Sequence, residues 1–118
     1  MALTVYHYPA CSTCRTALKW LDEYGIAHQR VHIVDHPPTR EELERALDQA
    51  ALPLRALFNT SGQSYRDGNF KDKLPKLSRA EALDALSHDG KLIKRPFVTS
   101  HDITLVGFDE AAWSKALR

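Results

Sequence analysis

The chain has 118 residues, 43% of them hydrophobic and 26% charged, which is typical of one compact globular domain over residues 1–118. Sixteen Lys and Arg residues against fifteen Asp and Glu residues leave a formal net charge of +1, so we expect no direct nucleic-acid binding. No apolar run approaches the ~20 residues that span a bilayer, and the N-terminus lacks a secretion-signal pattern. We therefore expect a cytoplasmic protein with no membrane partner.

The first third of the chain predicts a βαβ unit. Alternating β-branched and aromatic residues predict a strand over residues 3–8, which ends at Pro9. Apolar residues at helical spacing predict a helix over residues 14–24, with Gly25 as its left-handed C-terminal cap. Residues 28–34 predict a second strand, so a short helix connects two neighbouring strands.

The middle of the chain is predicted to be helical. Two capping boxes support this interpretation, one formed by Thr39 with Glu42 and the other by Ser78 with Glu81. The predicted elements are a helix over residues 40–50, a short helix over 52–58, a loop over 59–64, and a helix that runs to about Ser87 and ends near Gly90.

The last quarter of the chain predicts a hairpin and a helix. Two β-rich runs, residues 97–99 and 104–108, flank the polar pair His101-Asp102, as in an antiparallel hairpin. Asp109 is placed to cap a final helix. The order of the elements predicts an α/β fold with one small mixed central sheet covered by helices and a helical insertion in the middle of the chain.

The strongest chemical signal is the segment Tyr8-Pro9-Ala10-Cys11-Ser12-Thr13-Cys14-Arg15. It places Cys11 between a predicted strand and a predicted helix, where unpaired backbone N–H groups and the helix dipole favour a negative charge. Nearby Arg15 or a protonated His7 would further lower the pKa of this thiol. We predict that Cys11 is a nucleophilic thiolate and that Cys14, one turn further on, is the thiol that resolves its adducts.

Two other interpretations of the cysteine pair remain open. Free cysteines commonly pack as small apolar residues, although the neighbours of Cys11 are polar. A C-x-x-C pair can also supply half of a zinc site, but the sequence offers no second close Cys/His pair. His28, His32 and His36 would spread over more than ~10 Å of an extended strand. We therefore favour a redox-active dithiol and expect no metal.

A second signal is the segment Lys94-Arg95-Pro96, which precedes the predicted strand at residue 97. From residue type alone, Arg95 is either a guanidinium fork for an oxyanion or a solvated surface charge. The bond before Pro96 enters a strand beside the cysteine loop, where a cis peptide could hold two backbones close.

Several segments together resemble the ArsC-type arsenate reductase family, with its Spx-like and YffB-like branches. They are residues 6–11, the helix start Cys14-Arg15, the helix start Pro37-Pro38-Thr39, and the segments 57–62 and 92–96. The resemblance covers nearly the whole chain. It implies a thioredoxin-like fold with an inserted helical region and a cis bond between Arg95 and Pro96.

The resemblance also implies a mechanism. In it, the Cys11 thiolate attacks the arsenic of bound arsenate, glutathione resolves the adduct, and glutaredoxin restores the reduced state. His7 corresponds to a family histidine that favours the thiolate, and Arg95 to an arginine that grips the oxyanion. The substrate-binding residues expected from the resemblance are Ser12, Thr13, Arg15, Asn59 and Pro96.

Two departures from the family pattern concern charge. Glutaredoxin-coupled arsenate reductases have two further arginines beside the oxyanion, and this chain has Asn59 and Gly107 at those positions. A charge-assisted hydrogen bond is worth ~1.5–3 kcal/mol, so losing two weakens anion binding by about 10² to 10⁴-fold unless Arg55, Arg66 or Lys71 compensates.

The third departure is Cys14, where that branch of the family usually has serine. An internal second thiol allows a Cys11–Cys14 disulfide that thioredoxin or glutaredoxin would reduce. We therefore expect a thiol-dependent reductase of arsenate, or of a related thiol or disulfide substrate, with no bound cofactor. The alternative is an Spx-like redox-switched regulator that binds RNA polymerase, because Spx-like proteins share the C-x-x-C.

Overall fold

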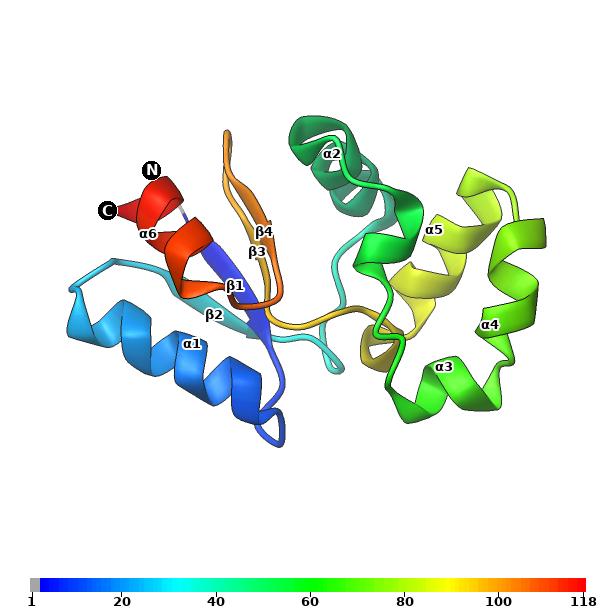
Figure 1. The fold of residues 1–118 in the computed structure, drawn as a ribbon, viewed down its shortest axis with the longest axis horizontal. Coiled ribbons are helices and arrows are strands. Elements are labelled where there is room, and N and C mark those ends of the chain that lie inside the picture. The colour runs from blue at the N-terminus through cyan, green and yellow to red at the C-terminus, as the bar shows by residue number, and fades with distance from the viewer. Residues whose placement is uncertain (1–2) are drawn as a thin grey trace.

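The structure, a computed structural model, describes residues 3–118 and is built on a four-stranded mixed sheet. The strands are β1 (Thr4–His7), β2 (Gln29–His32), β3 (Phe97–Thr99) and β4 (Thr104–Val106), in the order β2-β1-β3-β4. β1 and β2 are parallel, whereas β1 pairs with β3 and β3 with β4 in antiparallel register. The predicted βαβ unit and C-terminal hairpin are both confirmed (Figure 1).

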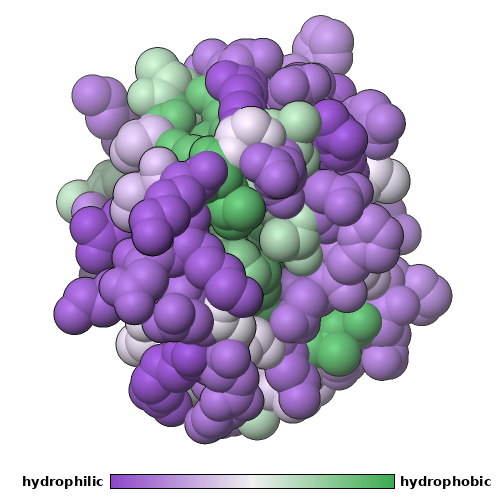
Figure 2. Space-filling model, turned by 90° about the vertical axis from the view of Figure 1, so that its right-hand side faces the viewer, coloured by the Kyte–Doolittle hydropathy of each residue, from purple (hydrophilic) through white to green (hydrophobic). Residues whose placement is uncertain are grey.

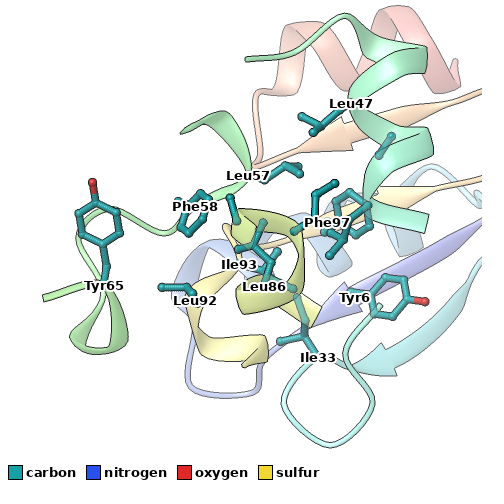
Figure 3. Packing of buried hydrophobic residues seen from close by; sticks show 14 residues of the cluster. Tyr6, Ile33, Leu47, Leu57, Phe58, Tyr65, Leu86, Leu92, Ile93 and Phe97 are labelled. Atoms are coloured by element: carbon teal, nitrogen blue, oxygen red, sulfur yellow. The ribbon is translucent and has the colours of Figure 1, made fainter. Parts of the chain in front are cut away.

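Helices cover both faces of the sheet because side chains alternate along each strand. Val5 and Val98 point to the face covered by α1 (Ser12–Glu23) and α6 (Glu110–Leu117). Tyr6 and Phe97 point to the opposite face, which packs against the helical part of the chain. In Figure 3, Phe97 lies close to Leu86 and Ile93 of that part, so the sheet and the inserted helices share one core.

The helical part fills the chain between β2 and β3. Its helices and 3-10 turns are α2 (Arg40–Ala50), η1 (Leu54–Leu57), α3 (Gln63–Asp67), α4 (Phe70–Lys73), η2 (Leu74–Lys76), α5 (Arg79–His88) and η3 (Gly90–Leu92). Both predicted capping boxes are present at the starts of α2 and α5. A surface view of this side is mainly hydrophilic, with an apolar furrow running through it (Figure 2).

The structure corrects several predicted boundaries. The first helix begins at Ser12 rather than residue 14, because Cys11 itself is the N-cap. The predicted loop over residues 59–64 is too long, since α3 begins at Gln63, and α4 was not predicted. Neither helix has a side-chain cap, and both are held by an aromatic cluster of Phe58, Tyr65 and Phe70. Such tertiary packing overrides weak local signals.

The remaining boundary corrections are small. The short helix predicted over residues 52–58 is the 3-10 turn η1, and the strands predicted over 3–8, 28–34 and 104–108 are each shorter in the structure. The outermost residues of a strand in a small sheet have no hydrogen-bonding partner on the neighbouring strand. The hydrophobic pattern in the sequence therefore extends beyond the residues that pair. Within residues 3–118, no helix is both long and apolar enough to cross a membrane.

Candidate active site

Cys11 occupies the N-cap of α1, at the end of the loop that follows β1. Its backbone is extended, with φ −86° and ψ 113°, and its N–H donates to the Tyr8 carbonyl at 2.9 Å. The Cys11 Sγ accepts a hydrogen bond from the Cys14 backbone N–H at 3.3 Å. An N-cap side chain normally satisfies one of the open N–H groups of the first helical turn, and here a sulfur does so. The thiol therefore lies where a negative charge is stabilised.

The balance of forces at Cys11 favours the thiolate. Partial burial is the largest single influence and raises the pKa, but hydrogen bonds from the Cys14 side chain and backbone, together with Arg95, outweigh it. The net result is a Cys11 pKa below its ordinary value. Because the thiolate is the reactive form, this shift supports Cys11 as the nucleophile.

Cys14 has the opposite character. It is fully buried, and burial together with its hydrogen bond to Cys11 raises the pKa of Cys14 to about 12. Both cysteines are free thiols in the structure. Cys14 thus stays protonated and donates to the Cys11 thiolate, and an incoming macromolecule can reach only the Cys11 sulfur. This asymmetry is what a nucleophile and a resolving thiol require.

Arg95 lies beside the cysteine loop, on the segment that leads into β3. Its guanidinium carbon is 5.1 Å from the centroid of the Tyr8 ring, and its Nη1 donates to the Lys91 carbonyl at 3.3 Å. The Arg95 Nε is buried and has no hydrogen-bond partner among residues 3–118. The bond between Arg95 and Pro96 is cis, as the family resemblance implies. Arg95 is therefore fixed next to Cys11 rather than free at the surface.

Cys11 opens onto a pocket of about 650 Å³. Three parts of the chain meet there: the start of α1, the loop after η1, and the two segments that flank the β3–β4 hairpin. The pocket is lined by Ala10, Cys11, Ser12, Thr13, Asn59, Ser61, Gly62, Lys94, Arg95, Val106, Gly107, Phe108 and Asp109. Ser12 and Thr13 are the first helical residues of α1, whose backbone N–H groups have no carbonyl partner within the helix.

Other predicted site residues lie outside the pocket lining. Pro96 and Cys14 are buried behind it, although Cys14 contacts Cys11 directly. Arg15 is exposed, and its Nη1 donates to the Pro9 carbonyl at 2.7 Å, so it ties the cysteine loop to α1. Substrate binding by Arg15 stays a prediction.

His7 lies on β1 opposite His32 of β2, with the two ring centroids 6.3 Å apart. Burial, His32 and Arg30 all lower the pKa of His7, so the structure favours its neutral form near pH 7. The structure therefore disfavours a role for His7 as a cation beside Cys11. Any other influence of His7 on Cys11 stays a prediction.

Arg55, Arg66 and Lys71, the cations suggested as replacements for the two missing arginines, do not line the pocket. Arg66 instead donates to the Ser61 carbonyl at 3.1 Å. Lys94 does line it; its segment, Lys94-Arg95-Pro96, was singled out from the sequence, but Lys94 itself was assigned no role. The position of Lys94 in the pocket wall depends on how the β3–β4 hairpin folds back, and no local sequence motif predicts this. Asp109 also lines the pocket. The sequence predicted Asp109 only as the cap of the last helix, and it is the N-cap of α6.

No group of three or more His, Cys, Asp or Glu side chains within residues 3–118 is arranged to hold a metal ion. The groups of the site that can take part in chemistry are Cys11 with its contacting thiol Cys14, and the cations Lys94 and Arg95 of the lining. A thiol of lowered pKa at a helix start, a second thiol in contact with it and a guanidinium beside them form an arrangement that favours nucleophilic attack by sulfur.

The chain belongs to the ArsC family, whose family model matches residues 6–116. It is 47% identical over 110 residues to the uncharacterized protein YusI of Bacillus subtilis, covering 93% of each chain. The arsenate reductase of Rhizobium meliloti is 36% identical over 85% of this chain and 70% of its own. The regulatory protein MgsR of Bacillus subtilis is 28% identical over 91% of this chain and 83% of its own.

A solved structure shows the same fold. The crystal structure of an ArsC family related protein from Bacteroides fragilis superimposes with a TM-score of 0.93 at 42% sequence identity, covering 98% of this chain and 97% of the other. The thioredoxin-like fold with an inserted helical region is thereby confirmed. The family contains both reductases and regulators, so the particular activity of this chain has to be argued from its site.

Proposed function

We propose that the protein is a thiol-dependent reductase of the arsenate reductase type, acting on arsenate or on a related thiol or disulfide substrate. The observation that carries the proposal is the placement of Cys11, whose sulfur caps α1 at the wall of a 650 Å³ pocket and whose pKa is lowered by Cys14 and Arg95 against the effect of burial. A regulator that only senses oxidation needs the thiol pair but no such pocket.

In the proposed first step, the Cys11 thiolate attacks the electrophilic atom of the substrate. With arsenate, a sulfur–arsenic bond forms and a protonated oxygen leaves as water. With a disulfide, a mixed disulfide forms and the other half leaves as a thiolate. Arg95 and the open N–H groups of Ser12 and Thr13 bind the developing negative charge.

The second step resolves the adduct. A second thiol attacks the Cys11 sulfur, two electrons pass to the substrate, and arsenic leaves as arsenite. Cys14 is in contact with Cys11, and once Cys11 has lost its negative charge one of the influences that raise the pKa of Cys14 is gone. Cys14 therefore becomes a better nucleophile at the moment it is needed. Glutathione is the other candidate for this role.

The resulting disulfide must be reduced from outside. Because Cys14 is fully buried, a reducing thiol attacks at Cys11 and releases Cys14. Glutaredoxin or thioredoxin can perform this exchange, and the reducing cytoplasm is where we expect the cycle to run.

A coupled assay tests the proposal. Purified protein is given arsenate, or a small disulfide, with either glutathione and glutaredoxin or thioredoxin and its reductase, and consumption of the reduced nicotinamide cofactor is followed. We expect turnover in at least one combination, and none with Cys11→Ser. Absence of turnover in every combination, with both thiols shown to be free, would reject the proposal.

The second candidate function is a redox-switched regulator that binds RNA polymerase. It is supported by the similarity to MgsR and by Asn59 and Gly107, which leave the pocket with fewer cations than the reductase pattern has. A pull-down of RNA polymerase with the oxidised and the reduced protein separates the two. Polymerase retained in one redox state only would favour the regulator, and retention in neither would reject it.

A further inference from the structure

Lys94 and Gly107 lie against each other at the pocket wall. Gly107 follows β4 with a φ of +74°, and its N–H donates to the Pro96 carbonyl at 2.9 Å. A Cβ built on Gly107 would lie 3.1 Å from the Lys94 Cε and 3.8 Å from its Nζ. The stem of Lys94 therefore lies against Gly107, whose positive φ and missing Cβ leave room for that stem.

The charges of the lining leave Lys94 available to a ligand. The pocket is lined by two cations, Lys94 and Arg95, and one carboxylate, Asp109. That carboxylate accepts from the Ala111 N–H at 3.1 Å as the cap of α6. Among residues 3–118, Lys94 is not part of any salt bridge. An exposed ammonium group at a pocket wall, with no salt-bridge partner of its own, is available to pair with an anionic group of a ligand.

The size of the pocket shows what kind of anion. A volume of about 650 Å³ falls in the range of ~300–1,000 Å³ typical of sites for small organic ligands. A tetrahedral oxyanion at Cys11 and Arg95 would fill only part of it. A larger substrate therefore has room to extend from Cys11 and Arg95 along the lining that Lys94 shares.

We propose that Lys94, held across Gly107, selects substrates that carry an anionic group, such as a carboxylate, remote from the sulfur or other atom that reacts with Cys11. This inference rests on the proposed function, because it names the substrate class of the same site. Its chemical basis is one screened charge pair, which sets preference among substrates and leaves the reactivity of Cys11 itself unchanged.

Two aromatic disulfides test this selectivity. In 5,5′-dithiobis(2-nitrobenzoate), each ring carries a carboxylate, whereas 4,4′-dithiodipyridine is neutral. The Cys11 thiolate attacks one sulfur of either probe, the S–S bond breaks, and the second aromatic half leaves as a coloured thiolate or thione whose appearance gives the rate. We expect Lys94→Gln to slow the anionic probe about fivefold, the effect of an exposed charge pair worth ~1 kcal/mol, and to leave the neutral probe unchanged.

The matched control is Lys71→Gln, which removes the same charge from an exposed lysine that does not line the pocket. It should leave both rates unchanged, and Lys94→Arg should retain the preference of the wild type. Raising the salt concentration should reduce the preference of the wild type and leave that of Lys94→Gln unchanged.

Gly107→Ala tests the geometry independently. Its methyl group would lie 3.1 Å from the Lys94 Cε and displace the stem, so the anionic preference should fall part of the way toward that of Lys94→Gln, and the double variant should lose no more than Lys94→Gln alone. The ratio of the two rates is the readout, because a general loss of folding lowers both rates together.

The outcomes separate this inference from the proposed function. Equal effects of Lys94→Gln and Lys71→Gln on the anionic probe, or an equal slowing of both probes by Lys94→Gln, would overturn the role of Lys94 alone. A Cys11 that reacts with neither probe would overturn the proposed function as well.

Discussion

The two sides of the pocket differ in what they contribute. The sheet side supplies Cys11, the thiol of lowered pKa, and the first turn of α1, and Arg95 lies against it on the segment that enters β3. The helical side supplies Asn59, Ser61 and Gly62, none of which titrates near neutral pH. The groups that lower the pKa of Cys11 therefore lie on the sheet side, Cys14 in the first turn of α1 and Arg95 on the segment before β3. The helical side shapes the space in front of it.

This division explains how one fold can serve different substrates. The state of Cys11 depends on contacts with Cys14 and Arg95 that are internal to the protein. Under the proposed function, substrate preference depends on other residues of the pocket lining, including Lys94 and Asn59. Substitutions among these lining residues can change which substrate binds and leave the state of the Cys11 sulfur unchanged.

The largest expected effect is the loss of chemistry when the thiol is removed from the sheet side. Cys11→Ser should release no aromatic thiol from 4,4′-dithiodipyridine in the native state, because Cys14 is fully buried. Wild type should release two equivalents, one from attack by Cys11 and one from attack by Cys14 on the mixed disulfide. Cys14→Ser should stop after one equivalent. Two equivalents from Cys14→Ser would show that Cys14 is not the resolving thiol.

The next effect concerns the stability of the helical side. Leu83 of α5 is fully buried in the cluster that joins the inserted helices to Tyr6 and Phe97 of the sheet. Leu83→Ala should lower the free energy of unfolding by ~2–5 kcal/mol, measured by urea denaturation. Because the core is shared, unfolding should remain a single transition by both fluorescence and circular dichroism. Two separated transitions would show that the helical side unfolds independently.

Local sequence patterns predicted the sheet side well. The C-x-x-C after the first predicted strand placed Cys11 at a helix start, and the hairpin and the α6 cap followed from β-rich runs and Asp109. These features depend on neighbours within a few residues, so their signals are present in short segments. The family resemblance added the cis bond before Pro96, which is confirmed, and an oxyanion-binding role for Arg95, which stays a prediction.

The helical side was predicted less completely. Residues 63–73 form two short helices without side-chain caps, and packing among Phe58, Tyr65 and Phe70 stabilises them. The contact between Lys94 and Gly107 depends on how the hairpin folds back. Interactions between residues distant in sequence leave no periodic pattern in the sequence, so neither the two short helices nor the Lys94–Gly107 contact could be predicted from it.

A smaller effect is expected when the charge beside Cys11 is removed. Arg95→Gln should raise the pKa of Cys11, because the guanidinium favours the thiolate. A higher pKa means less thiolate at a given pH. Alkylation by neutral iodoacetamide at acidic pH should slow by about tenfold, as expected for one charge-assisted hydrogen bond of ~1.5 kcal/mol.

The pH profile of alkylation distinguishes this effect from a steric one. Its midpoint should move to higher pH in Arg95→Gln, and Arg95→Lys should lie between that variant and the wild type. Arg95→Gln and the wild type should react alike at a pH above the midpoints of both, where Cys11 is fully ionised. A lower rate at every pH with an unchanged midpoint would show that Arg95 acts by shaping the pocket instead.

The smallest effect tests whether the two sides are energetically separate. Ser78 accepts from the Glu81 N–H at 3.1 Å in the capping box of α5, far along the chain from the thiol. Ser78→Ala should cost ~1 kcal/mol of stability by urea denaturation, and Thr39→Ala at the start of α2 should cost a similar amount. Neither change touches Cys11 or its partners, so both variants should alkylate at the wild-type rate with the wild-type midpoint. A shifted midpoint in either variant would mean that helix stability on one side of the pocket controls the thiolate on the other.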